Sequence, residues 1–375
     1  MEREIYGEKI NQRNRQGNKQ GNKQGNKQRN YSGRKKQACR RKRRVRRVAS
    51  VVLAAMIFVF GMRMFCDAVW KYQFNNTGFS ENSEGSQTQG GIGADAGIDA
   101  ADDIEVDLEH LYSPYAILVD LESGKVLASH NGQDRIYPAS LTKIMTALLA
   151  IENTDNMDER MTMPEDLFQE LYAEDASMAG FLPGENVYMR DLLYGILLPS
   201  GAECCLAFAE RIAGSEEAFV DMMNQKAAEL GMVNTHFCNC TGLHNPEHYS
   251  TVEDMSVLLQ YALKNDMFKT VFTTSRYSVY PSNCHPDGFT FYSTMFQGKD
   301  SPVVTGGQII GGKTGYTGEA GLCLASLAEI GGKEYILVTA KADGNHQTEQ
   351  FHILDAINVY NQIGQNFAYP SDNEY

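Results

Sequence analysis

Hydrophobic and polar residues follow two different periods in the part of the chain that begins near residue 111. Residues 115–131 alternate between apolar and polar positions around Gly124, which predicts a β-hairpin. The next apolar positions recur at helical spacing and predict an amphipathic helix that begins near Ser140: Leu141, Ile144, Met145, Leu148 and Leu149. A pair of strands and then a helix therefore open the globular part of the chain.

The apolar pattern that follows is helical first and strand-like afterwards. Residues 152–275 show mostly helical spacing. The C-terminal part then returns to strands: residues 307–318 are Gly-rich, residues 321–330 and 333–342 are strand-like, and residues 348–364 read as a closing helix. Strands separated by a long helical segment are typical of an α+β fold that carries a mostly helical insertion.

The first 47 residues differ from the rest in charge. They hold 18 of the 34 Lys and Arg residues and 3 of the 47 Asp and Glu residues, so they carry +15 while the remainder carries −28. A repeated Gly-Asn-Lys-Gln unit and the dense like charge predict a disordered basic arm. A nucleic-acid-binding tail is the alternative, but the acidic body and the apolar segment that follows argue against it, and we expect no nucleic-acid partner.

Residues 48–70 form that apolar segment, and the fifteen residues from Val48 to Met62 carry no charge. Arg63 can extend to the far interface, and Trp70 suits an aromatic belt. The positive charge before the segment predicts a single-pass signal-anchor in the cell membrane, with a cytoplasmic N-terminus and an extracytoplasmic body. A cleaved signal peptide is the alternative, but no small-x-small cleavage pattern ends the apolar run.

The composition sets the other boundaries. Residues 71–109 are rich in Gly, Ser, Asn and Asp without periodicity, which predicts a flexible linker. Residues 110–368 form the predicted globular domain, and 369–375 a short tail.

Ser140 and Lys143 lie three positions apart where the predicted helix begins, so their side chains are neighbours. Lysine is almost never buried unless another group pairs with it or uses it. A serine hydroxyl becomes a good nucleophile when a base takes its proton, and a desolvated, neutral lysine can be that base. Alone, the pair also fits a helix-capping serine beside a lysine that reaches the solvent.

Two further short segments carry polar chemistry. In GGKTGYTG, residues 311–318, the glycines allow another backbone to approach, and Lys313 with Thr314 suits a carboxylate. In PSGAE, Ser200 lies in a turn between two predicted helices, where a capping serine would also be ordinary.

Together and in this order, the three motifs resemble those of the penicillin-binding serine D-alanyl-D-alanine carboxypeptidases, the low-molecular-mass group that shares the serine β-lactamase fold. The resemblance covers about residues 110–368 and includes AILVDLESGKVLASHN, YPASLTKIMTALLA, FLPGENVYMRDLLYGILLPSG, AFVDMMNQKAAELGMVNTHF and GGKTGYTGEAGLCLASLA. It implies a transpeptidase-like catalytic domain in which helices flank an antiparallel sheet. It further implies removal of the terminal D-Ala of peptidoglycan stem peptides through an acyl-enzyme, inhibition by β-lactams, and no cofactor or metal.

The resemblance also assigns roles to individual residues. Ser140 corresponds to the acylated nucleophile, Lys143 to its general base and Ser200 to the proton relay toward the leaving amine. Burial and the charge of a second cation, Lys313, would keep Lys143 neutral.

The same comparison assigns the substrate-binding groups. Lys313 and Thr314 correspond to the pair that binds the terminal carboxylate of the substrate. The backbone N–H groups of Ser140 and of Tyr316, which follows Gly315 and the Lys-Thr-Gly run, would form the oxyanion hole.

One position departs from the family pattern. The middle motif is usually Ser-x-Asn, whereas this chain has Ala202 in the third place. Loss of the asparagine hydrogen bonds lowers rates by about tenfold to a few hundredfold, so we expect reduced activity. A catalytically weak penicillin-binding sensor is one alternative. A serine β-lactamase is another, but no ExxLN string lies between Lys143 and Ser200.

The body contains six of the eight cysteines: Cys204, Cys205, Cys238, Cys240, Cys284 and Cys323. An oxidising exterior and an even number of thiols favour pairing. The family resemblance places the first four beside the cleft, so we expect a disulfide from Cys204 or Cys205 to Cys240. Buried free thiols are the alternative.

Two histidines, His244 and His248, are four residues apart in HNPEH. Pro246 and the lack of an HExxH pattern place them on a loop, so we expect solvated side chains rather than a metal site.

Overall fold

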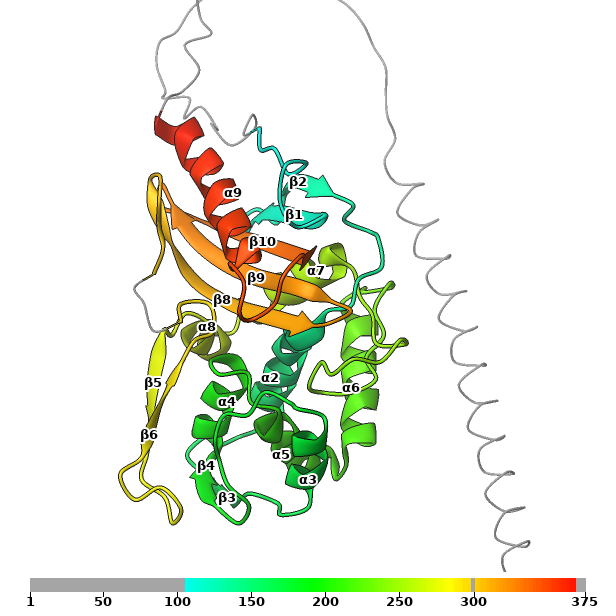
Figure 1. Ribbon diagram of the computed structural model, residues 1–375, viewed down its shortest axis with the longest axis vertical. Coiled ribbons are helices and arrows are strands. Elements are labelled where there is room, and N and C mark those ends of the chain that lie inside the picture. The colour runs from blue at the N-terminus through cyan, green and yellow to red at the C-terminus, as the bar shows by residue number, and fades with distance from the viewer. Residues whose placement is uncertain (1–104, 298–300, 369–375) are drawn as a thin grey trace, which may run out of the picture. The chain divides into compact units, whose positions relative to one another are not determined.

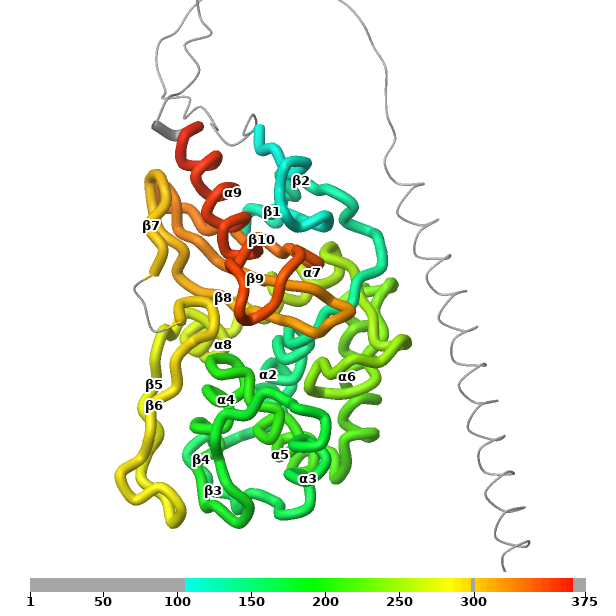
Figure 2. The backbone as a smooth tube through the Cα atoms, in the orientation of Figure 1, coloured from blue at the N-terminus to red at the C-terminus, as the bar shows by residue number. Residues whose placement is uncertain are grey.

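An antiparallel sheet organises the protein in the computed structural model, which describes residues 105–297 and 301–368 (Figure 1). The strand order is β2-β1-β10-β9-β8-β7. The strands are β1 (Tyr115–Asp120), β2 (Val126–His130), β7 (Val303–Val304), β8 (Gly307–Thr317), β9 (Gly321–Ile330) and β10 (Lys333–Ala342). The first hairpin, in cyan, lies beside the last strand, in orange (Figure 2), and Ile117 pairs with Val338. The sheet thus joins the two ends of the domain.

The segment between the two groups of strands is mostly helical. Its helices are η1 (Ala139–Thr142), α2 (Lys143–Glu152), α3 (Leu167–Ala173), α4 (Met189–Leu197), α5 (Ala202–Ala213), α6 (Glu216–Glu229), α7 (Val252–Ala262) and α8 (Asp266–Phe272). The predicted α+β fold, with a sheet flanked by helices and a mostly helical insertion, is confirmed. The sequence pattern missed two small two-stranded sheets, β3 (Arg160–Thr162) with β4 (Asn186–Tyr188) and β5 (Arg276–Val279) with β6 (Phe289–Tyr292).

Alternation along the central strands divides the core between the two faces of the sheet. Ile117 and Val338 belong to the large cluster formed with the helical segment. Leu118 and Leu337 belong to a smaller cluster with α9 (Phe351–Ala368), which crosses the other face (Figure 1). Because both faces are covered by apolar side chains, the strands that carry the functional motif are held rigidly in place.

The helix predicted to begin near Ser140 begins differently. Ala139 has a φ of +46°, and the chain passes through the 3₁₀ turn η1 before the α-helical turns start at Lys143. A left-handed residue cannot lie inside an α-helix, so Ser140 occupies a tight turn instead of the first helical turn.

The predicted arm (1–47) and membrane span (48–70) lie outside the described residues, as does most of the predicted linker. Within its last residues, 105–109, Leu108 is buried in the cluster with α9. Among the residues that the structure describes, no helix has both the length and the hydropathy needed to cross a membrane.

Gly364 provides a test of how tightly α9 packs on the sheet. A Cβ atom at this position would overlap the carbonyl oxygen of Thr305. We predict that Gly364→Ala lowers the free energy of unfolding by about 1–3 kcal/mol, although alanine favours a helix by about 1 kcal/mol over glycine. Urea unfolding of the full chain measures this. Gly318→Ala is the control, since a Cβ there meets nothing within 4 Å. A Gly364→Ala variant as stable as the control would contradict the packing.

Candidate active site

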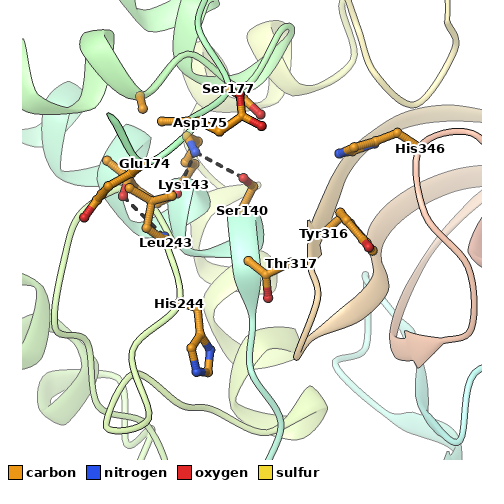
Figure 3. A pocket seen from close by; sticks show the side chains of 14 residues that line it. Ser140, Lys143, Glu174, Asp175, Ser177, Leu243, His244, Tyr316, Thr317 and His346 are labelled. Atoms are coloured by element: carbon orange, nitrogen blue, oxygen red, sulfur yellow. Dashed lines mark hydrogen bonds between the residues drawn. The ribbon is translucent and has the colours of Figure 1, made fainter. Parts of the chain in front are cut away.

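Ser140 and Lys143 meet at the junction of η1 and α2, beneath the edge of β8. Lys143 Nζ donates to Ser140 Oγ at 3.1 Å and to the carbonyl oxygen of Thr241 at 2.5 Å (Figure 3). The Lys143 side chain is only 2% exposed. The lysine of the sequence motif is therefore buried, and its two oxygen partners come from its own turn and from a loop 98 residues away.

A second lysine–serine pair lies behind the first. Lys313 Nζ donates to Ser200 Oγ at 3.0 Å and to the carbonyl oxygen of Thr314 at 2.7 Å. The Thr314 hydroxyl donates to that of Thr294 at 2.6 Å. Lys313 is fully buried and Ser200 is nearly so. The structure thus brings the middle motif and the Lys-Thr-Gly run together.

Close backbone packing holds these segments against one another. A Cβ atom on Gly315 would lie 3.1 Å from both Pro138 O and Ser140 N, so a larger residue there would push β8 and η1 apart by a few tenths of an ångström. Gly242, with a φ of +83°, packs against the carbonyl group of Ala139. The Ser200 backbone also has a left-handed φ of +70°, a conformation that costs a non-glycine residue about 1–3 kcal/mol and that is concentrated at functional sites.

Burial is the main influence on both lysines. It lowers the pKa of Lys143, because removal from water disfavours the ammonium form, although nearby thiols and Glu203 act in the opposite direction. Burial also lowers the pKa of Lys313 well below its usual value, and the charge of Lys143 lowers it further. The expectation named Lys313 as the cation that keeps Lys143 neutral. In the structure desolvation is the leading cause of the lowered pKa of both lysines.

A cavity of about 490 Å³ opens beside Ser140. Its lining includes Ser140, Lys143 and Tyr316 from the predicted set, whereas Ser200, Lys313, Thr314 and Gly315 are not among its lining residues. Sequence reasoning missed several other lining residues: Glu174, Asp175, Ser177, Thr241 and His346. Asp175 and Ser177 lie on the wall near Lys143, and Tyr316 and His346 on the opposite wall (Figure 3). These residues come from distant loops and carry no motif.

A family model described as D-alanyl-D-alanine carboxypeptidase matches residues 103–344. The chain belongs to this family. Relatives include D-alanyl-D-alanine carboxypeptidase DacF of Bacillus subtilis, 39% identical over 223 residues, which are 60% of this chain and 56% of the relative. A D-alanyl-D-alanine carboxypeptidase of Streptomyces is 31% identical over 57% of this chain and 75% of the relative. The match thus spans little more than half of the first of these relatives.

Solved structures from the family share the fold. The DD-transpeptidase of Streptomyces K15 superposes with a TM-score of 0.60 at 28% identity, over 69% of this chain and 98% of that one. A D-alanyl-D-alanine carboxypeptidase of Mycobacterium tuberculosis, at 23% identity, gives a TM-score of 0.58 over 73% of this chain and 96% of that one. The sheet with its helical insertion is therefore the fold of this family.

The predicted disulfide is wrong, because all six cysteines of the described part of the chain are free thiols. The Cys205 Sγ donates to the carbonyl oxygen of Gly201 at 3.4 Å, whereas the Cys204 Sγ packs beside Gly195 of α4. Burial raises the pKa of Cys205 to about 12, and it also raises that of Cys240. Since disulfide formation proceeds through a thiolate, burial makes these cysteines inert, as the alternative proposed.

The prediction that both loop histidines are solvated is wrong for His248, which is 2% exposed. Its Nδ1 accepts the N–H of Cys238 at 3.1 Å, so Nε2 carries the proton that is donated to Thr142 Oγ1 at 2.7 Å. His248 thus joins the 238–248 loop to the turn that carries Ser140. His244 lines the cavity, with its ring edge-on to Tyr137 at 4.8 Å. Within 105–297 and 301–368, no cluster of three or more His, Cys, Asp or Glu side chains is arranged to hold a metal.

The burial of His248 predicts how the free energy of unfolding depends on pH. Burial lowers its pKa to about 3, and the charges of His236, His244 and Lys143 add to this effect. The unfolded chain therefore binds a proton that the folded chain does not, once the pH falls below about 6.5, and folding weakens by about 1.4 kcal/mol per pH unit from there.

We expect the wild type to lose about 2 kcal/mol more than His248→Gln between pH 7.5 and pH 5 in urea unfolding, because glutamine does not titrate. His236→Gln serves as the control at an exposed histidine and should keep the wild-type slope. Parallel stability profiles for wild type and His248→Gln would show that the imidazole is not held neutral.

Proposed function

We propose that this protein is a serine D-alanyl-D-alanine carboxypeptidase that removes the terminal D-Ala of peptidoglycan stem peptides and is acylated by β-lactams. The observation that carries the proposal is the 3.1 Å contact between Ser140 Oγ and the amine of a buried lysine, at the wall of an open cavity. Membership of the family and the names of its relatives support the same activity.

The buried amine supplies the base. A neutral Lys143 can donate one N–H to the carbonyl oxygen of Thr241 and present its lone pair to the Ser140 hydroxyl. Ser140 Oγ then attacks the carbonyl carbon of the penultimate D-Ala while its proton moves to Nζ. The backbone N–H groups of Ser140 and Tyr316 are the proposed donors to the oxyanion.

The second lysine–serine pair would complete the turnover. Ser200 relays a proton toward the nitrogen of the departing D-Ala as the C–N bond breaks. Its contact with Lys313 at 3.0 Å supports this role, since the amine holds the Ser200 hydroxyl in place for the transfer. Lys313 and Thr314 are the proposed partners of the substrate carboxylate. Water then hydrolyses the ester, so that Ser140 regains its proton and the shortened peptide leaves as the acid.

The methyl group of Ala202 supports a second candidate function. Ala202 lines the cavity beside Lys143 where the family motif has an asparagine amide, and a methyl group donates and accepts no hydrogen bond. A catalytically weak penicillin-binding sensor would use the same acylation and then release its product very slowly. A serine β-lactamase would instead hydrolyse the penicilloyl ester rapidly.

Penicillin labelling tests the nucleophile and the base together. We expect mass spectrometry to show one penicilloyl adduct on Ser140 and no adduct in Ser140→Ala. Lys143→Arg should acylate at least about a hundredfold more slowly, because arginine does not give up its proton. A penicilloyl group on another serine, or a wild-type acylation rate in Lys143→Arg, would contradict these roles. Turnover of a peptide ending in D-Ala-D-Ala, with a long-lived penicilloyl ester, separates the carboxypeptidase from the sensor and from the β-lactamase.

We also propose that residues 48–70 anchor the protein in the cell membrane, with residues 1–47 in the cytoplasm and the catalytic domain outside. The excess of Lys and Arg before Val48 supports this orientation. A substrate in the cell wall requires the same arrangement.

Protease added to intact spheroplasts tests this topology. The catalytic domain should be digested while residues 1–47 remain protected, because only an extracytoplasmic body is accessible. Permeabilised spheroplasts are the control, in which both parts should be cut. Protection of the catalytic domain in intact spheroplasts would refute the orientation.

A further inference from the structure

One buried carboxylate beside the cavity has so far been described only as a group that opposes the lowering of the Lys143 pKa. Glu203 follows the middle motif directly, in the first turn of α5, and its side chain is fully buried. Its Oε1 atom accepts the N–H of Ala179 at 2.7 Å and that of Gly180 at 2.9 Å. Its Oε2 atom has no hydrogen-bond partner among the described residues. Burying a carboxylate is costly, so its two backbone contacts require an explanation.

Those contacts hold the segment that forms one wall of the cavity. Residues 174–177 line the cavity and follow the end of α3, and the chain then reaches Ala179 and Gly180. The N–H of Ala202 donates to the carbonyl oxygen of Ser177 at 2.8 Å. Glu203 and its neighbour therefore tie the wall to the turn that carries Ser200 through three hydrogen bonds.

Gly201 makes room for this attachment. A Cβ atom at position 201 would lie 2.6 Å from the Cβ of Ala179, 2.9 Å from its nitrogen and 3.0 Å from Glu203 Oε2. Ala179, which follows the wall in the chain, thus packs directly on the backbone of the middle motif. A single methyl group on residue 201 would push Ala179 away and displace the wall with it. Asp175, in the same wall, has a left-handed φ of +51°, so this segment depends on outside contacts for its shape.

We propose that Glu203 is a positioning residue whose buried carboxylate fixes the wall formed by residues 174–177 and thereby sets the affinity of the cavity for its peptide substrate. The expected kinetic effect rests on the proposed carboxypeptidase function. The two hydrogen bonds that Glu203 accepts from Ala179 and Gly180, here called the clamp, do not depend on that function. Burial raises the pKa of Glu203, and its backbone contacts act in the opposite direction. The hydrogen bonds, rather than the charge, are the feature that positions the wall.

The kinetic test uses the full chain and a peptide ending in D-Ala-D-Ala, with rates divided by the number of sites that a labelled penicillin titrates. Glu203→Ala should raise KM at least about tenfold per titrated site and change kcat by less than about threefold, because the wall binds substrate and does not react. Glu203→Gln keeps an oxygen acceptor for both N–H groups and should stay within about threefold of wild type in KM. Gly201→Ala, which displaces the wall and leaves the carboxylate in place, should raise KM as Glu203→Ala does.

A merely structural role gives a different result. Glu203→Ala would then reduce the titrated fraction and leave KM per site unchanged, and this outcome overturns the proposal. A Glu203→Gln variant as impaired in KM as Glu203→Ala also overturns it, since the charge would then be the requirement.

Amide hydrogen exchange of the peptide that contains Ala179 and Gly180 provides a readout that needs no activity. Exchange should be slow in wild type and Glu203→Gln and at least about tenfold faster in Glu203→Ala, because only the alanine variant frees both N–H groups. Equal exchange in wild type and Glu203→Ala overturns the clamp. A slow wild-type exchange in a protein that forms no penicilloyl adduct would instead overturn the proposed function and leave the clamp standing.

Discussion

The burial of two lysine side chains beside two serine hydroxyls is the constraint on which the rest of the structure depends. An ammonium group loses its hydration inside a protein, so it must find oxygen partners or give up its proton. Lys143 reaches Ser140 and the carbonyl oxygen of Thr241, and Lys313 reaches Ser200 and its own neighbour's carbonyl oxygen. Each amine is thus supported by oxygen atoms and not by a carboxylate, which would hold it in the charged form.

This arrangement requires backbones to lie unusually close together. Gly315 brings β8 against the turn before Ser140, and Gly242 brings the 240–242 loop against the same turn. The left-handed conformations of Ala139 and Ser200 aim the two serines at their lysines, and the apolar clusters on both faces of the sheet supply the stability that offsets such strain. The rigid sheet therefore holds the strained turns that carry the two serines.

The same packing explains why the polar residues around the site differ in reactivity. Cys205 and Cys240 lie close to Lys143, yet burial keeps them as thiols because it raises the pKa values of both. His248 is held neutral by the same desolvation and serves to join a loop to the Ser140 turn. Ser140, by contrast, combines a neighbouring amine with access to the cavity, and this environment supports its proposed role as the nucleophile.

Sequence alone determined the features that depend on local order. Apolar periodicity placed the first hairpin, the helical segment and the last two strands, and the family motifs singled out Ser140, Lys143, Ser200 and the Lys-Thr-Gly run as candidates for one site. The residues within each motif are close in sequence, so they also lie close together in the folded chain. Tertiary structure decided the features that depend on segments distant in sequence. These features depend on how segments distant in sequence meet: the contact between Lys143 and Thr241, the burial of His248, the contact between Glu203 and Ala179, and the free thiols of Cys205 and Cys240. Burial and hydrogen-bond partners are properties of that meeting, and no periodicity along the chain encodes them.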